Sequence, residues 1–264
     1  MRKAILLVAY GAENNMAKDG LAIFERACRE RFPGVPLRWA YSSPLVRNRI
    51  ALRGRKSDSL GKALRRLYYE KHDAIAIQPL QVIAGREYEA IGEDAREFMA
   101  ESGAKVATGS PLMLEDADAE ILARALIADM PENRAPDEAV VYMGHGAKHA
   151  NSRFYNILAQ KTLEKDVGAF VSSMNGDLDA VLNRVNSHKI WLAPLFANIG
   201  RHALEDMAGD KPESWLSRIR GAGFECVPYL RGLASGENVA GIWLKCLARA
   251  LGELEKRGAA EIKY

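Results

Sequence analysis

The sequence predicts an α/β protein built from two similar lobes, each a parallel sheet flanked by helices, with a cleft between them. Three observations support this fold class. Strand-like apolar runs alternate with amphipathic helical stretches, the pattern restarts near the middle of the chain, and the two halves carry matching motifs. The polar connection with two prolines near residues 131–137 separates the halves. We therefore predict lobes at 1–130 and 131–264.

The first lobe opens with Ala4 to Ala9, an uninterrupted apolar run that is typical of a buried parallel strand. The stretch after it has Leu21, Phe24 and Cys28 on one helical face, and Pro33-Gly34 ends that helix. Continuing in this way, we expect strands at 4–9, 37–41, 73–81 and 105–109, and helices at 18–32, 59–71, 85–102 and 117–130. The basic segment 47–56 is either a solvated helix end and loop or a ligand clamp.

The second lobe repeats this order, beginning with the apolar run Ala139 to Met143. By the same criteria, we expect strands at 139–143, 167–174, 189–194 and 225–230, and helices at 151–164, 177–185, 200–207, 215–221 and 239–254.

Composition excludes several classes of protein. The 264 residues carry a net charge of only +3, which gives no independent case for nucleic-acid binding. No segment is long and apolar enough to span a membrane, and the N-terminal apolar run is too short for a signal peptide. Three cysteines lack metal-ligand spacing and are expected to be reduced, partly buried thiols. We therefore expect a cytoplasmic protein.

The motif Gly144-His145-Gly146 follows the first strand of the second lobe. Flanking glycines allow a sharp turn and a close approach of the backbone to a ligand. The carboxyl ends of strands are where open α/β sheets place their sites. His145 is therefore the leading candidate for a functional residue.

An internal repeat extends this prediction to both lobes. Residues 4–12 align without gaps with residues 139–147, so Tyr10 falls on His145 and Gly11 on Gly146. Pro79-Leu80 with Gly85-Arg86-Glu87 likewise aligns with Pro194-Leu195 and Gly200-Arg201-His202. Because clefts between lobes are favoured binding places, we expect Tyr10, Glu87, His145 and His202 to face the cleft.

Two histidines and a carboxylate are ligands that suit cobalt, nickel, iron or zinc. The alternative for His202 is a solvent-facing histidine at a helix start. His149 lies four residues beyond His145, either supporting it or on the surface. His72 and His188 precede strands and are expected on the surface.

At these residues the chain resembles a known family along nearly its whole length. It is similar to the anaerobic cobalt chelatases of the CbiK type, which act on sirohydrochlorin in cobalamin synthesis and belong to the class II, ferrochelatase-like tetrapyrrole chelatases. The resemblance is carried by motifs in family order at 6–11, 77–89, 142–147, 193–195, 202–210 and 210–215, and by Gly232-Leu233.

The resemblance implies an enzyme, a lyase that inserts a divalent metal into a tetrapyrrole without a nucleotide. Cobalt is the expected ion, with nickel or iron as alternatives. His145 matches the family's essential histidine, for metal delivery and proton abstraction, and His202 matches its second metal ligand. Tyr10, Gly11, Glu87, Met174 and Asn175 are expected at the substrate.

The chain departs from the family pattern in the same region. Asn175 stands where the family has a third metal ligand, a glutamate followed by glycine. Ala12-Glu13 replaces a frequent hydroxyl pair, and Gln81 stands where many members have histidine.

Two other functions stay open at this point. One is a non-catalytic tetrapyrrole or metal carrier, and the other is a different small-molecule enzyme on the same scaffold. Five arginines are candidates for binding substrate carboxylates: Arg47, Arg49, Arg53, Arg86 and Arg201. The tetrapyrrole is the expected partner, nucleic acid and membrane are not, and a homo-oligomer is an open alternative.

Overall fold

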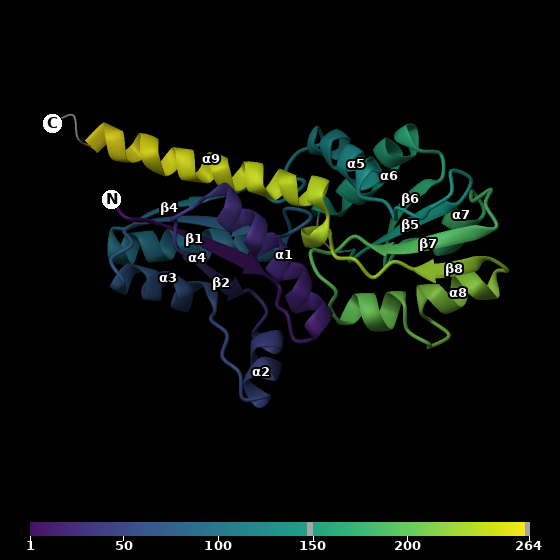
Figure 1. The fold of residues 1–264 in the computed structure, drawn as a ribbon, viewed down its shortest axis with the longest axis horizontal. Helices are drawn as coiled ribbons and strands as arrows, with labels where there is room; N and C mark the ends of the chain where they lie inside the picture. Colours follow the sequence, from purple (N-terminus) through teal and green to yellow (C-terminus); the bar gives the residue numbers. More distant parts are fainter. Residues whose placement is uncertain (147–149, 262–264) are drawn as a thin grey trace. The chain divides into compact units, whose positions relative to one another are not determined.

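The computed structural model describes residues 1–146 and 150–261, with side chains described except at 150 and 257–261 (Figure 1). The chain forms two compact units, the first made of Met1–Leu112 with Gly241–Tyr264 and the second of Met113–Ala240. Each unit contains one four-stranded parallel sheet flanked by helices, which confirms the predicted α/β fold class. The cleft between the lobes stays a prediction.

The first unit is built on strands β1 (Lys3–Ala9), β2 (Leu37–Tyr41), β3 (Ala74–Pro79) and β4 (Lys105–Thr108). Their order in the sheet is β2-β1-β3-β4, and all neighbours are parallel. Every residue of Ala4–Ala9 is buried, because helices cover both faces of the sheet. This explains why β1 is an uninterrupted apolar run instead of an alternating one.

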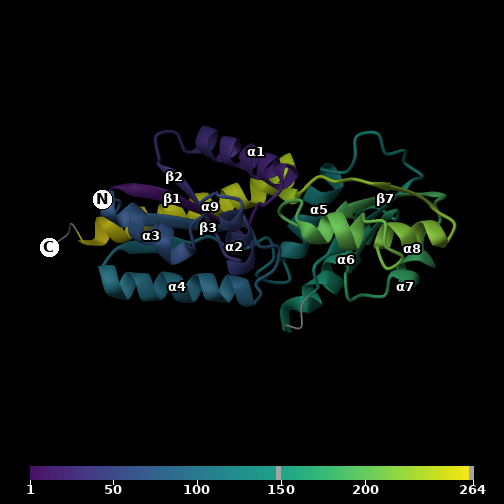
Figure 2. The same cartoon turned by 90° about the horizontal axis from the view of Figure 1, so that it is seen from below.

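Five helices flank this sheet: α1 (Asn15–Arg31), α2 (Pro44–Leu52), α3 (Leu60–Tyr69), α4 (Arg86–Ser102) and the later part of α9 (Glu237–Glu261). Helices α3 and α4 share one apolar cluster with β1, β3 and β4, and they lie side by side in Figure 2. Phe24 of α1 meets Trp243 of α9 edge to face, with ring centroids 6.0 Å apart. These contacts fix the sheet between two helical layers.

Helix α2 was not predicted. Its apolar pattern is short and weak, but Ser43 caps its first turn and Pro44 occupies the first helical position. The basic segment 47–56 forms the rest of α2 and the loop after it. Arg49 forms an ion pair with Glu13 at 3.1 Å, and Arg53 donates to the Glu13 carbonyl at 2.9 Å.

The second unit repeats the sheet, with β5 (Ala139–Gly144), β6 (Ala169–Ser173), β7 (Lys189–Pro194) and β8 (Glu225–Pro228). The order β6-β5-β7-β8 is the order of the first sheet, strand for strand. Helices α5 (Asp118–Ala128), α6 (Phe154–Lys165), α7 (Leu178–Leu182) and α8 (Trp215–Gly221) flank it. Shorter elements are two 3₁₀ turns, Ala150–Arg153 and Leu233–Ser235, and a π-helix, His202–Met207, called the π-helical turn below.

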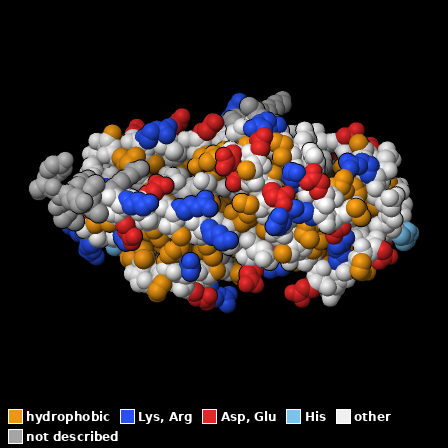
Figure 3. Space-filling view, turned by 90° about the horizontal axis from the view of Figure 1, so that it is seen from above, with side chains coloured by type: hydrophobic (Ala, Val, Ile, Leu, Met, Phe, Trp, Pro, Cys, Tyr) orange, Lys and Arg blue, Asp and Glu red, His pale blue; other side chains and the backbone are white. Residues whose placement is uncertain are grey.

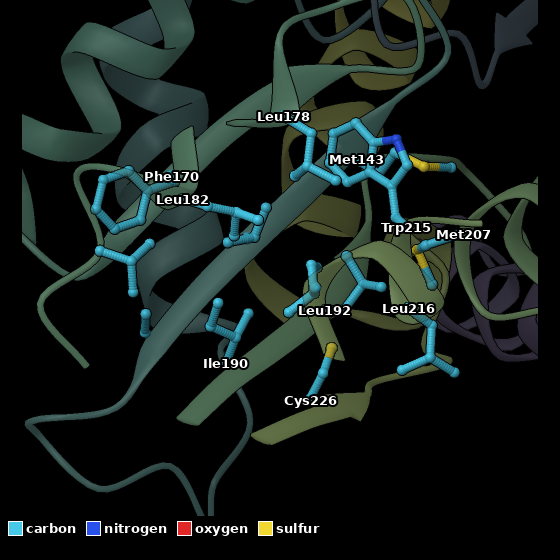
Figure 4. Packing of buried hydrophobic residues seen from close by; sticks show 14 of the residues in the cluster. Met143, Phe170, Leu178, Leu182, Ile190, Leu192, Met207, Trp215, Leu216 and Cys226 are labelled. Atoms are coloured by element: carbon cyan, nitrogen blue, oxygen red, sulfur yellow. The ribbon is translucent and has the colours of Figure 1, made fainter. Parts of the chain in front are cut away.

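The core of the second unit lies between its sheet and α7, α8 and the π-helical turn. Figure 4 shows Met143 of β5 and Leu192 of β7 in one apolar layer with Trp215 and Leu216 of α8. The carboxyl ends of β5 and β7 are thereby held on a packed base.

The two units exchange the helix that follows the last strand of each sheet. Helix α5 follows β4 but belongs to the second unit, where the Tyr142 hydroxyl donates to the Leu126 carbonyl at 2.9 Å. Helix α9 follows β8 but returns to the first unit, where Glu255 pairs with Lys3. The observed boundaries therefore differ from the predicted 130/131 division, because these two helices pack away from the strands they follow.

Backbone hydrogen bonds show the internal repeat directly. Leu80 N–H donates to Val8 O at 2.8 Å, and Leu195 N–H donates to Met143 O at 2.8 Å. In both units this bond links the loop after the third strand to the carboxyl end of the first strand. The predicted correspondence of the two loops is therefore structural as well as sequential.

Within the described residues, no helix is long and apolar enough to cross a bilayer. The face shown in Figure 3 has basic and acidic side chains interspersed over it, in keeping with the small net charge. The three cysteines are free thiols, as predicted, and they are buried where partial burial was expected. Burial raises the pKa of Cys28 and of Cys226 to about 12.

Candidate active site

Two histidines meet at the carboxyl ends of neighbouring strands in the second unit. His145 follows β5 directly, and His202 opens the π-helical turn after β7. Their imidazole rings lie edge to face, with centroids 4.7 Å apart and planes at 87°. His145 is exposed and the His202 side chain is 41% exposed, so both rings are open to solvent. The sequence thus predicted two residues that the fold brings into contact.

The two positions beside His145 require glycine for different physical reasons. A Cβ on Gly144 would stand 2.3 Å from Cε1 of Tyr155, so only glycine lets the α6 ring pack there. Gly146 has φ +69°, in the left-handed region that favours glycine. The first glycine gives space and the second gives the turn that presents His145.

Tyr155 of α6 packs against the His145 turn. Its side chain is buried against Gly144. Burial raises the pKa of the Tyr155 hydroxyl, and hydrogen bonds with the backbone of Gly146 and His145 oppose that rise. The phenol therefore ties the backbone of the turn to α6.

The hydrogen bonds of the two imidazoles decide which nitrogens are available. Nδ1 of His145 lies 2.9 Å from the Gly146 carbonyl oxygen, and Nδ1 of His202 lies 2.6 Å from Oδ2 of Asp206. A carbonyl or carboxylate oxygen only accepts, so each Nδ1 carries the proton and donates. In its neutral form each ring then keeps the lone pair on Nε2, which is the atom that can hold a metal or take a proton.

Sequence reasoning missed three residues of this site: Phe196, Asp206 and Tyr155. Phe196 flanks both histidine rings, at 6.5 Å from each centroid. The i,i+4 spacing of His202 and Asp206 was a usable signal, because residues four apart share a helix face. Phe196 and Tyr155 gave no comparable signal, since each reads as ordinary core in the sequence.

Met174 and Asn175 follow β6, the strand beside β5. Met174 N–H donates to the Gly144 carbonyl at 2.8 Å, and its side chain packs against the core of the second unit. Asn175 is exposed, and its Nδ2 lies 3.3 Å from the place of a Cβ on Gly146. The asparagine thus lies beside the His145 turn, where the resemblance places a third ligand.

Across the residues that the structure describes, no three histidine, cysteine or acidic side chains gather as a metal cluster. The candidate site is therefore a pair of nitrogen donors with an amide nearby. Such a site leaves most positions around an ion open to water or to an incoming ligand.

The first unit presents the equivalent positions with different side chains. Tyr10 is 45% exposed at the end of β1, and Gly11 is buried against Val46 of α2. Glu87 lies in the first turn of α4, where desolvation raises the pKa of its carboxyl and a hydrogen bond with Gln81 opposes the rise. Their grouping with the histidines of the second unit stays a prediction.

The remaining histidines separate clearly. His188 is exposed before β7, as predicted, whereas the prediction for His72 was wrong. His72 is 7% exposed because it closes the turn between α3 and β3, where its backbone N–H donates to the Leu67 carbonyl. His149 and Ala147, which extend the His145 motif, lie outside the described residues.

Comparisons with known proteins agree with the residue pattern. A family model described as cobalt chelatase (CbiK) matches residues 3–252. The sirohydrochlorin cobaltochelatase CbiKC of Nitratidesulfovibrio vulgaris is 41% identical over 260 residues, which cover 96% of this chain and 92% of that protein. The sirohydrochlorin cobaltochelatase of Salmonella typhimurium is 29% identical over 95% of this chain and 97% of that protein.

Solved structures show the same fold at low identity. SirB from Bacillus subtilis with Fe3+ superposes with a TM-score of 0.68 at 14% identity, covering 95% of this chain and 96% of that one. The sirohydrochlorin chelatase SirB in complex with cobalt gives 0.66, again at 14% identity, covering 95% of both chains. This chain therefore shares its fold with solved chelatase structures.

Proposed function

Because the chain belongs to the cobalt chelatase (CbiK) family, we propose that it inserts Co2+ into sirohydrochlorin, without a nucleotide, in cobalamin synthesis. The observation that carries this proposal is the His145–His202 pair. Both rings have Nδ1 engaged, so each keeps Nε2 available, and the two rings are in contact. Imidazole nitrogen is a good ligand for Co2+, and also for Ni2+ and Fe2+, which stay alternatives.

Metal insertion exchanges one divalent ion for two pyrrole N–H protons. The ion must be held and partly dehydrated, and the protons must be accepted as the new metal–nitrogen bonds form. One Nε2 lone pair can do only one of these tasks at a time. A pair of histidines allows one ring to hold the ion while the other takes one of the two protons, and the second proton leaves to water. We assign metal delivery to His145, followed by proton abstraction once the ion has left its Nε2, and the second metal contact to His202.

A site with only two strong donors suits a metal that is substrate. Structural sites use four protein ligands and hold their ion permanently. Here the ion has to leave for the tetrapyrrole, so weak holding speeds transfer. The neutral Asn175 beside the His145 turn fits this requirement.

Arginines provide the counter-charge that substrate carboxylates need. Arg86 is exposed in the first turn of α4, and Arg201 has the equivalent place before the π-helical turn. Arg201 is paired with Glu205, and Arg49 and Arg53 contact Glu13. Arg86 is therefore our first choice for a substrate carboxylate. Tyr10, Gly11, Glu87, Met174 and Asn175 are proposed to line the macrocycle.

The test is an insertion assay that follows the absorption spectrum of sirohydrochlorin with Co2+, Ni2+ and Fe2+ in parallel. We expect insertion above the uncatalysed rate, fastest with cobalt, and no effect of added ATP. A matched reaction with the His145→Ala protein shows how much of the absorption change comes from sirohydrochlorin binding without metal insertion. Sirohydrochlorin that is bound but never metallated would overturn the proposal in favour of a carrier.

A further inference from the structure

The carboxylate of Asp206 is directed at one of the two candidate metal ligands. Both residues belong to the π-helical turn, four positions apart, and Nδ1 of His202 lies 2.6 Å from Oδ2 of Asp206. The turn is widened there, with Ala208 N–H donating to Ala203 O five residues back. The hydrogen bond to Asp206 therefore restrains the His202 imidazole at Nδ1.

Two further rings pack near the His202 imidazole. The His145 ring lies edge to face with it at 4.7 Å, and the Phe196 ring lies 6.5 Å away, tilted by 45°. With Asp206 on Nδ1 and two rings packed nearby, the direction of Nε2 is defined.

The two histidines differ in what accepts their Nδ1–H. For His145 the acceptor is the neutral Gly146 carbonyl, and for His202 it is the charged Asp206 side chain. A carboxylate on one ring nitrogen selects the tautomer and makes the opposite nitrogen a stronger electron donor. The two rings are therefore not equivalent ligands.

We propose that Asp206 is a positioning residue that fixes His202 in the Nδ1–H tautomer and strengthens Nε2 as the donor to the substrate metal. This inference rests on the proposed function, because it assumes that His202 contacts the ion. It predicts that His202 contributes more than His145 to holding the ion.

A neighbouring ion pair supplies the matched control. Arg201 and Glu205 have the same i,i+4 spacing in the same turn, at 2.9 Å, and the Glu205 side chain is 47% exposed, like that of Asp206. Glu205→Ala removes an equal charge from the same segment without touching a histidine. Any effect of Asp206→Ala that exceeds that of Glu205→Ala comes from the contact with His202.

The first measurement is the tautomer itself, by nitrogen-15 NMR of histidine-labelled protein without metal. We expect the His202 signals of the wild type to show Nδ1 protonated and Nε2 bare. Asp206→Ala should give a mixture of tautomers, Glu205→Ala should not, and Asp206→Asn should restore the wild-type tautomer through its amide oxygen. A wild-type His202 protonated on Nε2 would overturn the proposal, even if the variants failed to fold.

The second measurement is calorimetric titration with Co2+ in the absence of tetrapyrrole. Loss of a partner of this kind costs roughly 10- to 100-fold in metal affinity, so we expect about a tenfold increase in Kd for Asp206→Ala. Glu205→Ala should stay within twofold of the wild type. An unchanged Kd in Asp206→Ala, together with a large loss in His202→Ala, would refute the role of Asp206 and keep the metal site. An unchanged Kd in His202→Ala would instead refute the proposed metal site.

Discussion

The rings of His145 and His202 lie edge to face with centroids 4.7 Å apart, although 56 residues separate them in sequence. Two neighbouring parallel strands, β5 and β7, make this contact, because their carboxyl ends open at the same edge of the sheet. Each ring donates from Nδ1 to an oxygen acceptor, which leaves two Nε2 atoms for the ion and for a proton.

Replacing His145 with alanine should abolish metal insertion and leave the fold intact. The side chain is exposed, so its loss leaves no cavity, while the reaction loses its proton acceptor and one metal donor. We expect the insertion rate to fall by about 10²- to 10⁴-fold with Tm unchanged. His188→Ala is the matched control, because His188 is also exposed but lies at the amino end of β7. Normal insertion by the His145 variant would refute its assignment.

Asn175→Glu should tighten divalent metal binding. The amide lies beside the His145 turn, and a carboxylate at that place would add a charged oxygen donor to two neutral nitrogens. We expect Kd for Co2+ to fall about tenfold, measured by calorimetric titration. Asn175→Gln adds the same length without charge and should have no such effect. Equal affinities of the Glu and Gln variants would count against a ligand position at residue 175.

Gly144→Ala should damage both stability and activity. Its Cβ would stand 2.3 Å from Cε1 of Tyr155, so the α6 ring or the His145 turn must move. Overpacking of this kind costs about 1–3 kcal/mol, which thermal or denaturant unfolding would detect. Gly221→Ala is the control, since a Cβ there meets nothing within 4 Å. If both variants were equally stable, Tyr155 could not be packed against Gly144 as described.

Much of this fold could be predicted because both sheets are buried on two faces. Strands such as β1 and β5 contain long apolar runs, Ala4 to Ala9 and Ala139 to Met143, and glycine, proline and polar runs mark their ends. The repeat then aligned His145 with Tyr10 and His202 with Glu87, at the loops after the first and third strands of each sheet. Helix α2 escaped prediction because its stability comes from the Ser43 cap and contacts with the Glu13 loop, and not from a strong apolar stripe.

The exchange of helices between the units and the residues that support the histidine pair could not be predicted, because both depend on tertiary contacts. Nothing in the sequence around α5 or α9 shows which sheet each helix covers. The pairing of Phe24 with Trp243 becomes visible only in the folded unit. Tyr155 and Phe196 likewise read as core residues until their neighbours are known.

Glu138 should make the free energy of unfolding depend on pH in the acidic range. Hydrogen bonds from Trp191, from the Ala135 backbone and from Lys189 lower the pKa of its carboxyl to about 2. A folded pKa below the unfolded value stabilises the protein above the unfolded pKa, near 4.5, and the gain is lost as pH falls towards 2. Urea unfolding from pH 7 to pH 2 should therefore show Glu138→Gln less stable at neutral pH, with the difference shrinking below about pH 4.5. A constant difference across this range would contradict the assignment.

Asp129 should stabilise the start of α9, from a position more than a hundred residues earlier in the chain. Its carboxylate accepts from Asn238 N–H at 3.1 Å, from Val239 N–H at 2.9 Å and from Asn238 Nδ2 at 2.8 Å. The two backbone N–H groups belong to the first turn of α9 and have no acceptor within the helix. The Asp129 carboxylate therefore caps α9 although Asp129 is not adjacent to this helix in sequence.

Asp129→Ala should therefore lower the free energy of unfolding by about 1–2 kcal/mol, the usual cost of a lost cap. Denaturant unfolding gives this value, and Asp129→Asn should recover part of it because an amide oxygen also caps. Asp137→Ala removes an exposed acidic residue from a loop of the same unit and is the control for charge alone. Equal losses in the Asp129 and Asp137 variants would show that net charge, and not the cap, explains the effect. Since α9 begins in the second unit and continues into the first, a lost cap should also speed amide exchange in its first turns.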